Sequence, residues 1–408
     1  MAHQKSSSVS RRRVFYIPGY DPIHPRRYRE LYRTESKAQA DISGYEVGLS
    51  PRKGERYGWN VEGRFGDTGV STEFEVLVWS DIVRDSMETD IPSTYLQLAR
   101  TAWTYITSGA LRRLMWLRKG PVIAALYPVG MLIAQLLIAI ALAYGIAIGA
   151  GKIFTAISVS PLVGYTLALP VFVYALRWFR RKDNKFFAYY LMHDYAYSAQ
   201  SKGANPPELE QRMAQFVDVI ANALNDEVDE VLVVGHSSGA HLGVSILSDL
   251  LRQNRLPANG PTLSFLSLGQ VVPMVSFLPK ADRLRADLHY LSQSQDVAWV
   301  DVTAPGDGCA FALCDPVAVS GVAPEHQTGP LVISAAFTQT LQPETWKKLR
   351  WRFFRLHFQY LCAFDRPGDY DYFQITAGPM TLGERYNGRN PSKSRIDLAA
   401  SRYTSMAA

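Results

Sequence analysis

A serine between two glycines, at the end of an apolar run, is the feature of this chain best suited to chemistry. The motif Gly235-His-Ser237-Ser-Gly239 follows the apolar, mostly β-branched run 231–234 and precedes the helix-forming run 240–251. This order predicts a buried strand, a sharp turn and a helix, with Ser237 at a strained apex and its hydroxyl exposed. Glycine is needed at positions 235 and 239, because the turn brings strand and helix too close together for a Cβ atom. We interpret Ser237 as a nucleophile, in preference to a residue of a purely structural glycine-rich turn.

In this strand–turn–helix context the chain resembles the α/β-hydrolase superfamily, in its serine esterase and lipase-like branch. The resemblance implies a mostly parallel sheet flanked by helices, with strands and helices alternating along the chain. It also implies an acid and then a histidine after the serine, each at the carboxyl end of a strand. Acyl transfer by a serine needs this base, the carboxylate that orients it, and N–H donors for the oxyanion.

Two aspartates follow the nucleophile at positions suited to the acid. Asp307 comes just after the strand expected at 297–303, which is the second strand after the nucleophile, where the resembling family usually places its acid. We therefore interpret Asp307 as the acid, with Asp315 as the alternative.

Two histidines come after Asp307 in the chain. His357 follows the last predicted strand, 331–337, as the family's histidine normally does, whereas His326 precedes that strand. We interpret His357 as the base and His326 as the alternative. His357 falls in a segment predicted as one long helix, 343–364, rather than in the family's usual short loop.

The remaining part of such a site is a pair of backbone N–H groups for the oxyanion. The resemblance points to Ser238, directly after the nucleophile, and to Tyr20, in a Pro-Gly-Tyr loop where proline replaces the family's histidine. The sequence has no phosphate-binding or dinucleotide glycine motif and no His or Cys pair at metal spacing. We therefore expect an enzyme that needs neither a cofactor nor a metal.

Two long apolar segments interrupt the soluble sequence. No charged residue lies between Lys119 and Lys152, and none between 153 and 176. Because about 20 apolar residues cross a membrane, we predict spans over about 123–149 and 154–176. Basic residues flank the outer ends, so the positive-inside rule places both termini and the catalytic domain in the cytoplasm. Small residues every four positions predict a close helical hairpin, with these residues at its interface: Ala141, Gly145, Gly149, Gly164 and Ala168.

Composition sets the remaining expectations. The formal net charge is +6, the basic residues are clustered, and no nucleic-acid motif accompanies them, so we expect a membrane surface rather than nucleic acid as partner. Three cysteines without regular spacing indicate reduced thiols. We expect a disordered basic tail over 1–12, an α/β domain in two parts over 13–110 and 186–380, the membrane hairpin over 111–185, and a C-terminal tail over 381–408.

Together these features predict a membrane-anchored serine hydrolase that cleaves a small-molecule or lipid acyl ester or thioester. The alternatives are an acyltransferase on the same three residues, and a catalytically inactive hydrolase fold that acts as a membrane scaffold. The sequence carries no signal for the oligomeric state.

Overall fold

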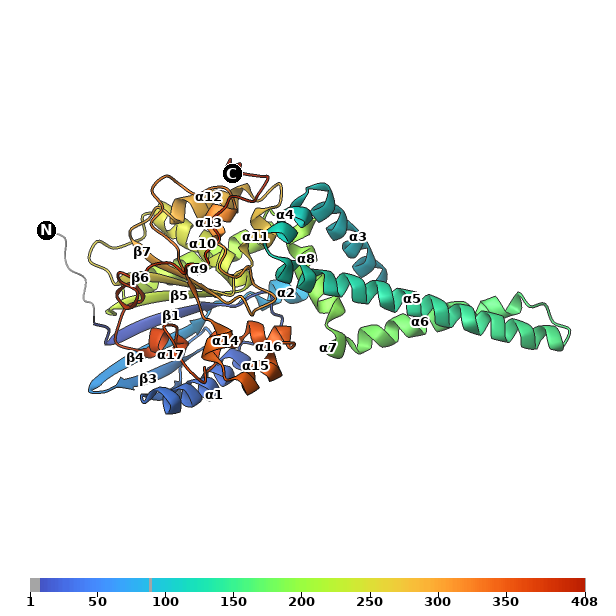
Figure 1. Cartoon of the computed structure of the whole chain (residues 1–408), viewed down its shortest axis with the longest axis horizontal. Coiled ribbons are helices and arrows are strands. Elements are labelled where there is room, and N and C mark those ends of the chain that lie inside the picture. Colours follow the sequence, from blue (N-terminus) through green and yellow to red (C-terminus); the bar gives the residue numbers. More distant parts are fainter. Residues whose placement is uncertain (1–7, 88–89, 408) are drawn as a thin grey trace.

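The structure, a computed structural model, describes residues 8–87 and 90–407 (Figure 1). The strands are β1 (Arg11–Ile17), β2 (Glu46–Pro51), β3 (Gly58–Phe65), β4 (Thr68–Val76), β5 (Glu230–His236), β6 (Thr262–Leu268), β7 (Val297–Thr303) and β8 (Leu331–Ser334). Over the described residues they form one eight-stranded sheet in the order β2-β3-β4-β1-β5-β6-β7-β8. Neighbours from β4 to β8 pair in parallel, and β2, β3 and β4 pair antiparallel. The predicted α/β class with a mostly parallel sheet is confirmed.

Helices cover both faces of the sheet. The helices of the α/β domain are α1 (Arg26–Ser43), α2 (Ser80–Met87), α9 (Pro207–Ala223), α10 (Ser238–Arg252), α11 (Val272–Ser276), α12 (Asp282–Leu291), α13 (Pro316–Val319), α14 (Phe337–Thr340), α17 (Tyr372–Ala377) and α18 (Leu382–Arg385). Successive side chains of β1 enter different cores, because neighbours on a strand point to opposite faces. Phe15 and Ile17 pack with α9 and α10, whereas Val14 and Tyr16 pack with α1 and α17. This double-sided burial fixes the carboxyl end of β1 beside that of β5.

The first strand begins inside the segment predicted as a disordered tail. Its Arg12 is fully buried, and Nε donates a hydrogen bond of 2.6 Å to the buried carboxylate of Glu230 on β5. The same guanidinium donates to the backbone carbonyls of Gly378 and Met380, at 2.8 and 2.6 Å. These bonds hold the start of β1 in place, so Arg11 and Arg12 of the predicted tail belong to the first strand. Residues 1–7 of the predicted tail lie outside the described residues.

The C-terminal segment beyond residue 380 packs along the edge of the sheet. The backbone N–H of Ser392 donates to Val332 of β8 at 2.9 Å, and that of Ile396 donates to Leu313 at 2.7 Å. Farther along, the carbonyl of Ser405 accepts a hydrogen bond from Arg285 at 2.7 Å. The segment predicted as a tail is therefore in contact with the domain.

The long helix predicted over 343–364 is wrong. The structure divides it into α15 (Pro343–Leu349), α16 (Phe353–His357) and the 3-10 turn η1 (Gln359–Leu361). Trp346 lies against Gly306 and Phe353 lies against Gly308, so both helices dock on the same loop after β7. The break places His357 at the end of a five-residue helix.

A helical arm extends from the α/β domain (Figure 1). Its long members are α5 (Lys119–Ala156) and α6 (Val163–Arg181), which pack against each other, and its base is made by α3 (Ile91–Thr107), α4 (Ala110–Leu117), α7 (Asp183–Phe186) and α8 (Ala188–Gln200). Leu132 of α5 is fully buried against α8, whereas the following turns of α5 expose large apolar side chains such as Leu137 and Ile140. Contiguous exposed apolar surface of this kind marks a membrane or protein contact.

Among the described residues, α5 is the one helix long and apolar enough to cross a membrane, by length and composition. The second span predicted over 154–176 differs from the structure, because residues up to Ala156 belong to α5 and the chain turns before Val163. The apolar part of α6 ends at Leu176, before Arg177. At 1.5 Å per residue it is about 21 Å long, short of the hydrocarbon thickness of about 30 Å.

The interface between α5 and α6 uses a different row of small residues from the one predicted. The buried small residues of α5 are Ala139, Ala143, Ala147 and Gly151. Gly145 and Gly149, predicted at the interface, have no heavy atom near the position of a Cβ. Gly164 of α6 is at the interface as predicted, since its Cβ would lie 2.5 Å from the carbonyl oxygen of Ala147. Two rows of small residues run along α5, and sequence spacing alone does not choose between them.

Candidate functional site

Ser237 occupies the turn between β5 and α10 in a strained backbone conformation. Its φ is 57° and its ψ is −120°, in a region that L-residues rarely adopt. A Cβ on Gly235 would lie 2.5 Å from the carbonyl oxygen of Gly239, and one on Gly239 would lie 2.1 Å from that of Ile17. Both glycines are therefore required by the close approach of α10 to the ends of β5 and β1. The strained turn leaves the Ser237 side chain half-buried on the wall of a cavity.

Asp307 and His357, 50 residues apart in the chain, are joined by a buried hydrogen bond of 2.7 Å between Oδ2 and Nδ1. The hydroxyl of Tyr360 donates to the same Oδ2 at 3.0 Å, and the backbone N–H of Cys309 donates to Oδ1 at 2.8 Å. Burial disfavours the charged form of Asp307, but His357 and these donors outweigh it and hold the pKa below its ordinary value. The carboxylate is thus ionised and fixed beside the imidazole.

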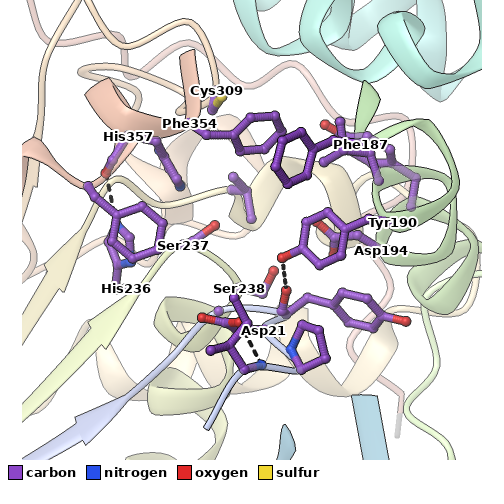
Figure 2. Close-up of a pocket in the computed structure, with 18 of the residues that line it drawn as sticks. Asp21, Phe187, Tyr190, Asp194, His236, Ser237, Ser238, Cys309, Phe354 and His357 are labelled. Atoms are coloured by element: carbon purple, nitrogen blue, oxygen red, sulfur yellow. Dashed lines mark hydrogen bonds between the residues drawn. The ribbon is translucent and has the colours of Figure 1, made fainter. Parts of the chain in front are cut away.

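The other ring nitrogen of His357 is directed to the same cavity as Ser237 (Figure 2). Nε2 is buried and has no hydrogen-bond partner among the described residues, so it is not bonded to the Ser237 hydroxyl. In enzymes without substrate, catalytic hydrogen bonds are often long and shorten when substrate binds. The structure thus brings Ser237, Asp307 and His357 to one site, with the Asp–His contact formed and the His–Ser contact open.

His236 packs against His357 and binds its backbone. Its Nε2–H donates to the backbone carbonyl of His357 at 3.0 Å, and the two rings lie 4.9 Å apart. Burial lowers the pKa of His236 to about 3, so its ring is neutral. Neither this role nor that of Tyr360 was predicted. In the sequence His236 occupies only the variable position of the serine motif, and its partner is 121 residues away.

Tyr20 and Ser238 both line the cavity beside Ser237. Ser238 is the first residue of α10, where backbone N–H groups have no partner within the helix. Tyr20 follows Gly19, whose Cβ position lies 3.4 Å from the Ser237 hydroxyl oxygen, and its carbonyl accepts a hydrogen bond of 2.6 Å from the hydroxyl of Tyr190. The loop after β1 is thereby held against the nucleophile turn.

The alternative acid and base lie outside the cavity. Asp315 is buried at the N-terminus of α13, where it accepts hydrogen bonds from the amides of Val317 and Ala318 at 3.0 and 3.1 Å. His326 is exposed in the turn before β8. Neither residue lines the cavity that contains Ser237.

The cavity has a volume of about 610 Å³ and is mainly apolar. One wall is formed by Ser237, His236 and His357, and the opposite wall by residues of α8 with Phe187 (Figure 2). Pro121, at the start of α5, also lines it, so the site opens beside the base of the arm. A ligand-sized cavity with a few convergent polar groups is typical of a substrate site.

Asp307, Cys309 and His357 each offer a potential metal-ligating atom, all within 4.8 Å of one another. The thiolate is the form of cysteine that binds metals. Burial raises the pKa of Cys309 well above its ordinary value, which keeps the thiol protonated. Oδ2 of Asp307 and Nδ1 of His357 already bond to each other, so the geometry favours an acid–base pair over a metal centre.

No family model, curated protein or solved structure matches this chain. The α/β class therefore rests on the sheet and its helices, and the candidate site rests on the geometry of its residues.

Proposed function

We propose that this chain is a membrane-anchored serine hydrolase of the α/β-hydrolase kind, which cleaves acyl esters or thioesters. The observation that carries the proposal is the buried Asp307–His357 hydrogen bond on the wall of a cavity that also holds Ser237 on a strained turn. A carboxylate, an imidazole and a hydroxyl in this order are the parts that acyl transfer by serine requires.

In the proposed reaction, Ser237 Oγ attacks the acyl carbonyl carbon while Nε2 of His357 accepts the hydroxyl proton. The N–H groups of Ser238 and Tyr20 stabilise the oxyanion of the tetrahedral intermediate. The C–O or C–S bond to the leaving group then breaks, and His357 returns the proton to the departing oxygen or sulfur. Water, deprotonated by His357, attacks the acyl-serine, which releases the carboxylic acid and restores Ser237. Asp307 keeps Nδ1 protonated and stabilises the imidazolium in both steps.

The arm suggests where the substrate comes from. We place α5 and α6 together in the bilayer, with the exposed apolar side chains of both helices in contact with lipid. The basic residues gather at the base of the arm, which favours a cytoplasmic catalytic domain; the exposed ones are Arg112, Lys119, Arg177, Arg180, Arg181, Lys182 and Lys185. Because the cavity is lined by Pro121 and Phe187 at this base, it faces the membrane surface. A lipid or other acyl ester held in the bilayer fits this position.

The proposed nucleophile is tested by covalent labelling with a fluorophosphonate probe in detergent. The intact protein is expected to be labelled, and Ser237→Ala is expected to abolish the labelling because the probe phosphonylates an activated serine. Ser198→Ala is the matched control, since Ser198 lines the same cavity on the helix α8 and should leave labelling unchanged. Absence of labelling in the intact, folded protein would favour an inactive scaffold. Labelled protein that transfers acyl groups to an added alcohol faster than to water would favour the acyltransferase.

The membrane anchor is tested by placing a charge on the arm. Leu137, near the middle of α5, is 60% exposed, and Leu137→Arg is expected to disfavour insertion by about 2.5–3.5 kcal/mol. A clear fall in the fraction of protein that resists carbonate extraction from membranes is the expected result. Trp116→Arg, at an exposed position outside α5, is the control and should remain membrane-bound. Equal extraction of the two variants would contradict insertion of α5.

A further inference from the structure

Asp194 is a carboxylate that the proposed reaction does not use. It belongs to α8 and lines the cavity beside Tyr190, on the side opposite His357 and Ser237 (Figure 2). Among the described residues no hydrogen bond or ion pair reaches it, and the ionic effect on it comes from His357. The Asp194 side chain is half-buried, and a carboxylate without a protein partner in such a place is stabilised either by taking up a proton or by a cationic group of a ligand.

The other charged residues of the cavity already have partners. Arg27 forms an ion pair of 3.1 Å with Asp21. Asp183 accepts hydrogen bonds from the first amides of α8, the nearest at 2.8 Å. Arg355 forms an ion pair of 3.3 Å with Glu35. Asp194 is thus the charged group of this cavity that is free to bind a ligand.

Three tyrosines near Asp194 direct their hydroxyl groups elsewhere. That of Tyr20 bonds to Ser86 Oγ at 2.6 Å, that of Tyr105 to the Met274 carbonyl at 2.9 Å, and that of Tyr190 to the Tyr20 carbonyl at 2.6 Å. The charge of Asp194 nevertheless acts on all three, which places them near it. The hydroxyl groups of these three tyrosines are thus bonded to other partners, and the three residues line the cavity together with Asp194.

The aromatic side chains form a continuous wall. Tyr20 and Tyr190 have ring centroids 6.5 Å apart, Tyr190 and Phe187 6.3 Å, and Phe187 and Phe354 5.7 Å. Aromatic rings attract cations through their quadrupoles, and quaternary ammonium groups bind in cages of this kind. A carboxylate inside such a wall adds a direct charge interaction.

We infer that Asp194 and the rings of Tyr20, Tyr190 and Phe187 form a subsite for an ammonium group, across the cavity from Ser237. The inference rests on the proposed function in one respect, namely that the ammonium belongs to the ester substrate. The preferred substrate is then an acyl ester or thioester with a cationic group in its alcohol or thiol part. A neutral ester of the same shape binds without the charge interaction.

The test compares two thioesters of equal shape, butyrylthiocholine and S-(3,3-dimethylbutyl) thiobutyrate, on the full chain in detergent. The wild type is expected to have a kcat/KM about tenfold or more higher for the cationic thioester. Asp194→Asn should remove this preference, because kcat/KM should fall far more for the cationic thioester than for the neutral one. Asp296→Asn, which removes one exposed negative charge far along the chain, is the control and should keep the preference.

The preference should also depend on pH. Burial raises the pKa of Asp194 to about 7, so below this pH the carboxyl is protonated and the preference for the cation should fall. The ratio of the two kcat/KM values separates this effect from the pH dependence of acyl transfer itself, which acts on both thioesters. The other titratable groups that face Asp194 are Tyr20, Tyr105, Tyr190, Tyr195 and Cys309.

Three results would overturn the inference: equal kcat/KM values for the two thioesters in the wild type, a preference that survives in Asp194→Asn, or an equal loss on both thioesters. Calorimetric titration with tetramethylammonium distinguishes this inference from the proposed function. Binding that is lost in Asp194→Asn, in a protein whose Ser237 takes no fluorophosphonate, would retain the subsite and reject the hydrolase. Absence of binding to the wild type would reject the subsite, whatever Ser237 does.

Discussion

Asp307→Asn is expected to lower kcat for ester cleavage by about four orders of magnitude while the protein stays folded. Oδ2 of Asp307 lies 2.7 Å from Nδ1 of His357 in the buried pair. An asparagine amide of the same shape presents either an N–H donor or an uncharged oxygen to Nδ1. The first favours the tautomer with the proton on Nε2, which leaves no base for Ser237, and the second no longer stabilises the imidazolium. The measurement is kcat for a soluble nitrophenyl ester, with thermal unfolding as the check on folding.

Two controls isolate the carboxylate. Tyr360→Phe removes a hydrogen bond of 3.0 Å to the same oxygen but keeps the charge, so we expect a loss of about tenfold or less. Asp315→Asn, at the alternative acid, should leave kcat near the wild-type value, because Asp315 binds amides of α13 outside the cavity. A kcat for Asp307→Asn within a few-fold of the wild type would reject Asp307 as the acid.

The sequence located the parts of the candidate site that depend on local order. Ser237 was found from its own neighbours, because a turn between a buried strand and a helix has a short sequence signature. Asp307 and His357 were placed by their order relative to the strands, and the structure brings them together at 2.7 Å. Asp194 was missed, since an aspartate in a tyrosine-rich helix carries no motif. Asp194 stands out only because it lines the cavity without a partner among the described residues while neighbouring tyrosine hydroxyls bond to other groups, and only the fold determines this.

In the fold, too, features that depend on local sequence were predicted, whereas those that depend on distant contacts were not. The apolar runs that predicted strands at 262–268 and 297–303 correspond to β6 and β7, because buried parallel strands are apolar along their length. The division of 343–364 into short helices was not predictable from its own residues, since no proline or glycine follows Pro343 in this segment. The start of β1 was missed for a related reason: the partner of Arg12 is 218 residues away.

That long-range pair gives the largest expected effect on stability. Arg12→Met should lower the free energy of unfolding by about 3–5 kcal/mol, because it leaves the Glu230 carboxylate buried without its cation. Both side chains are fully buried, and the substitution also removes hydrogen bonds to the carbonyls of Gly378 and Met380. The measurement is guanidinium unfolding in detergent. Arg11→Met is the matched control, since its ion pair with Glu227 is largely exposed and should contribute at most about 1 kcal/mol.

A double substitution tests whether the unpaired charge, and not the lost side chain, causes this effect. In Arg12→Met with Glu230→Leu no carboxylate remains to be desolvated, so the double variant should be more stable than Arg12→Met alone. Recovery should be incomplete, because the Ser264 hydroxyl and the Leu382 amide, which donate to Glu230 at 2.6 and 2.8 Å, lose their acceptor. A double variant as unstable as the sum of the two single ones would show that the ion pair acts only through packing. Partial recovery would show that the charge pair itself stabilises the contact between the first strand and the nucleophile strand.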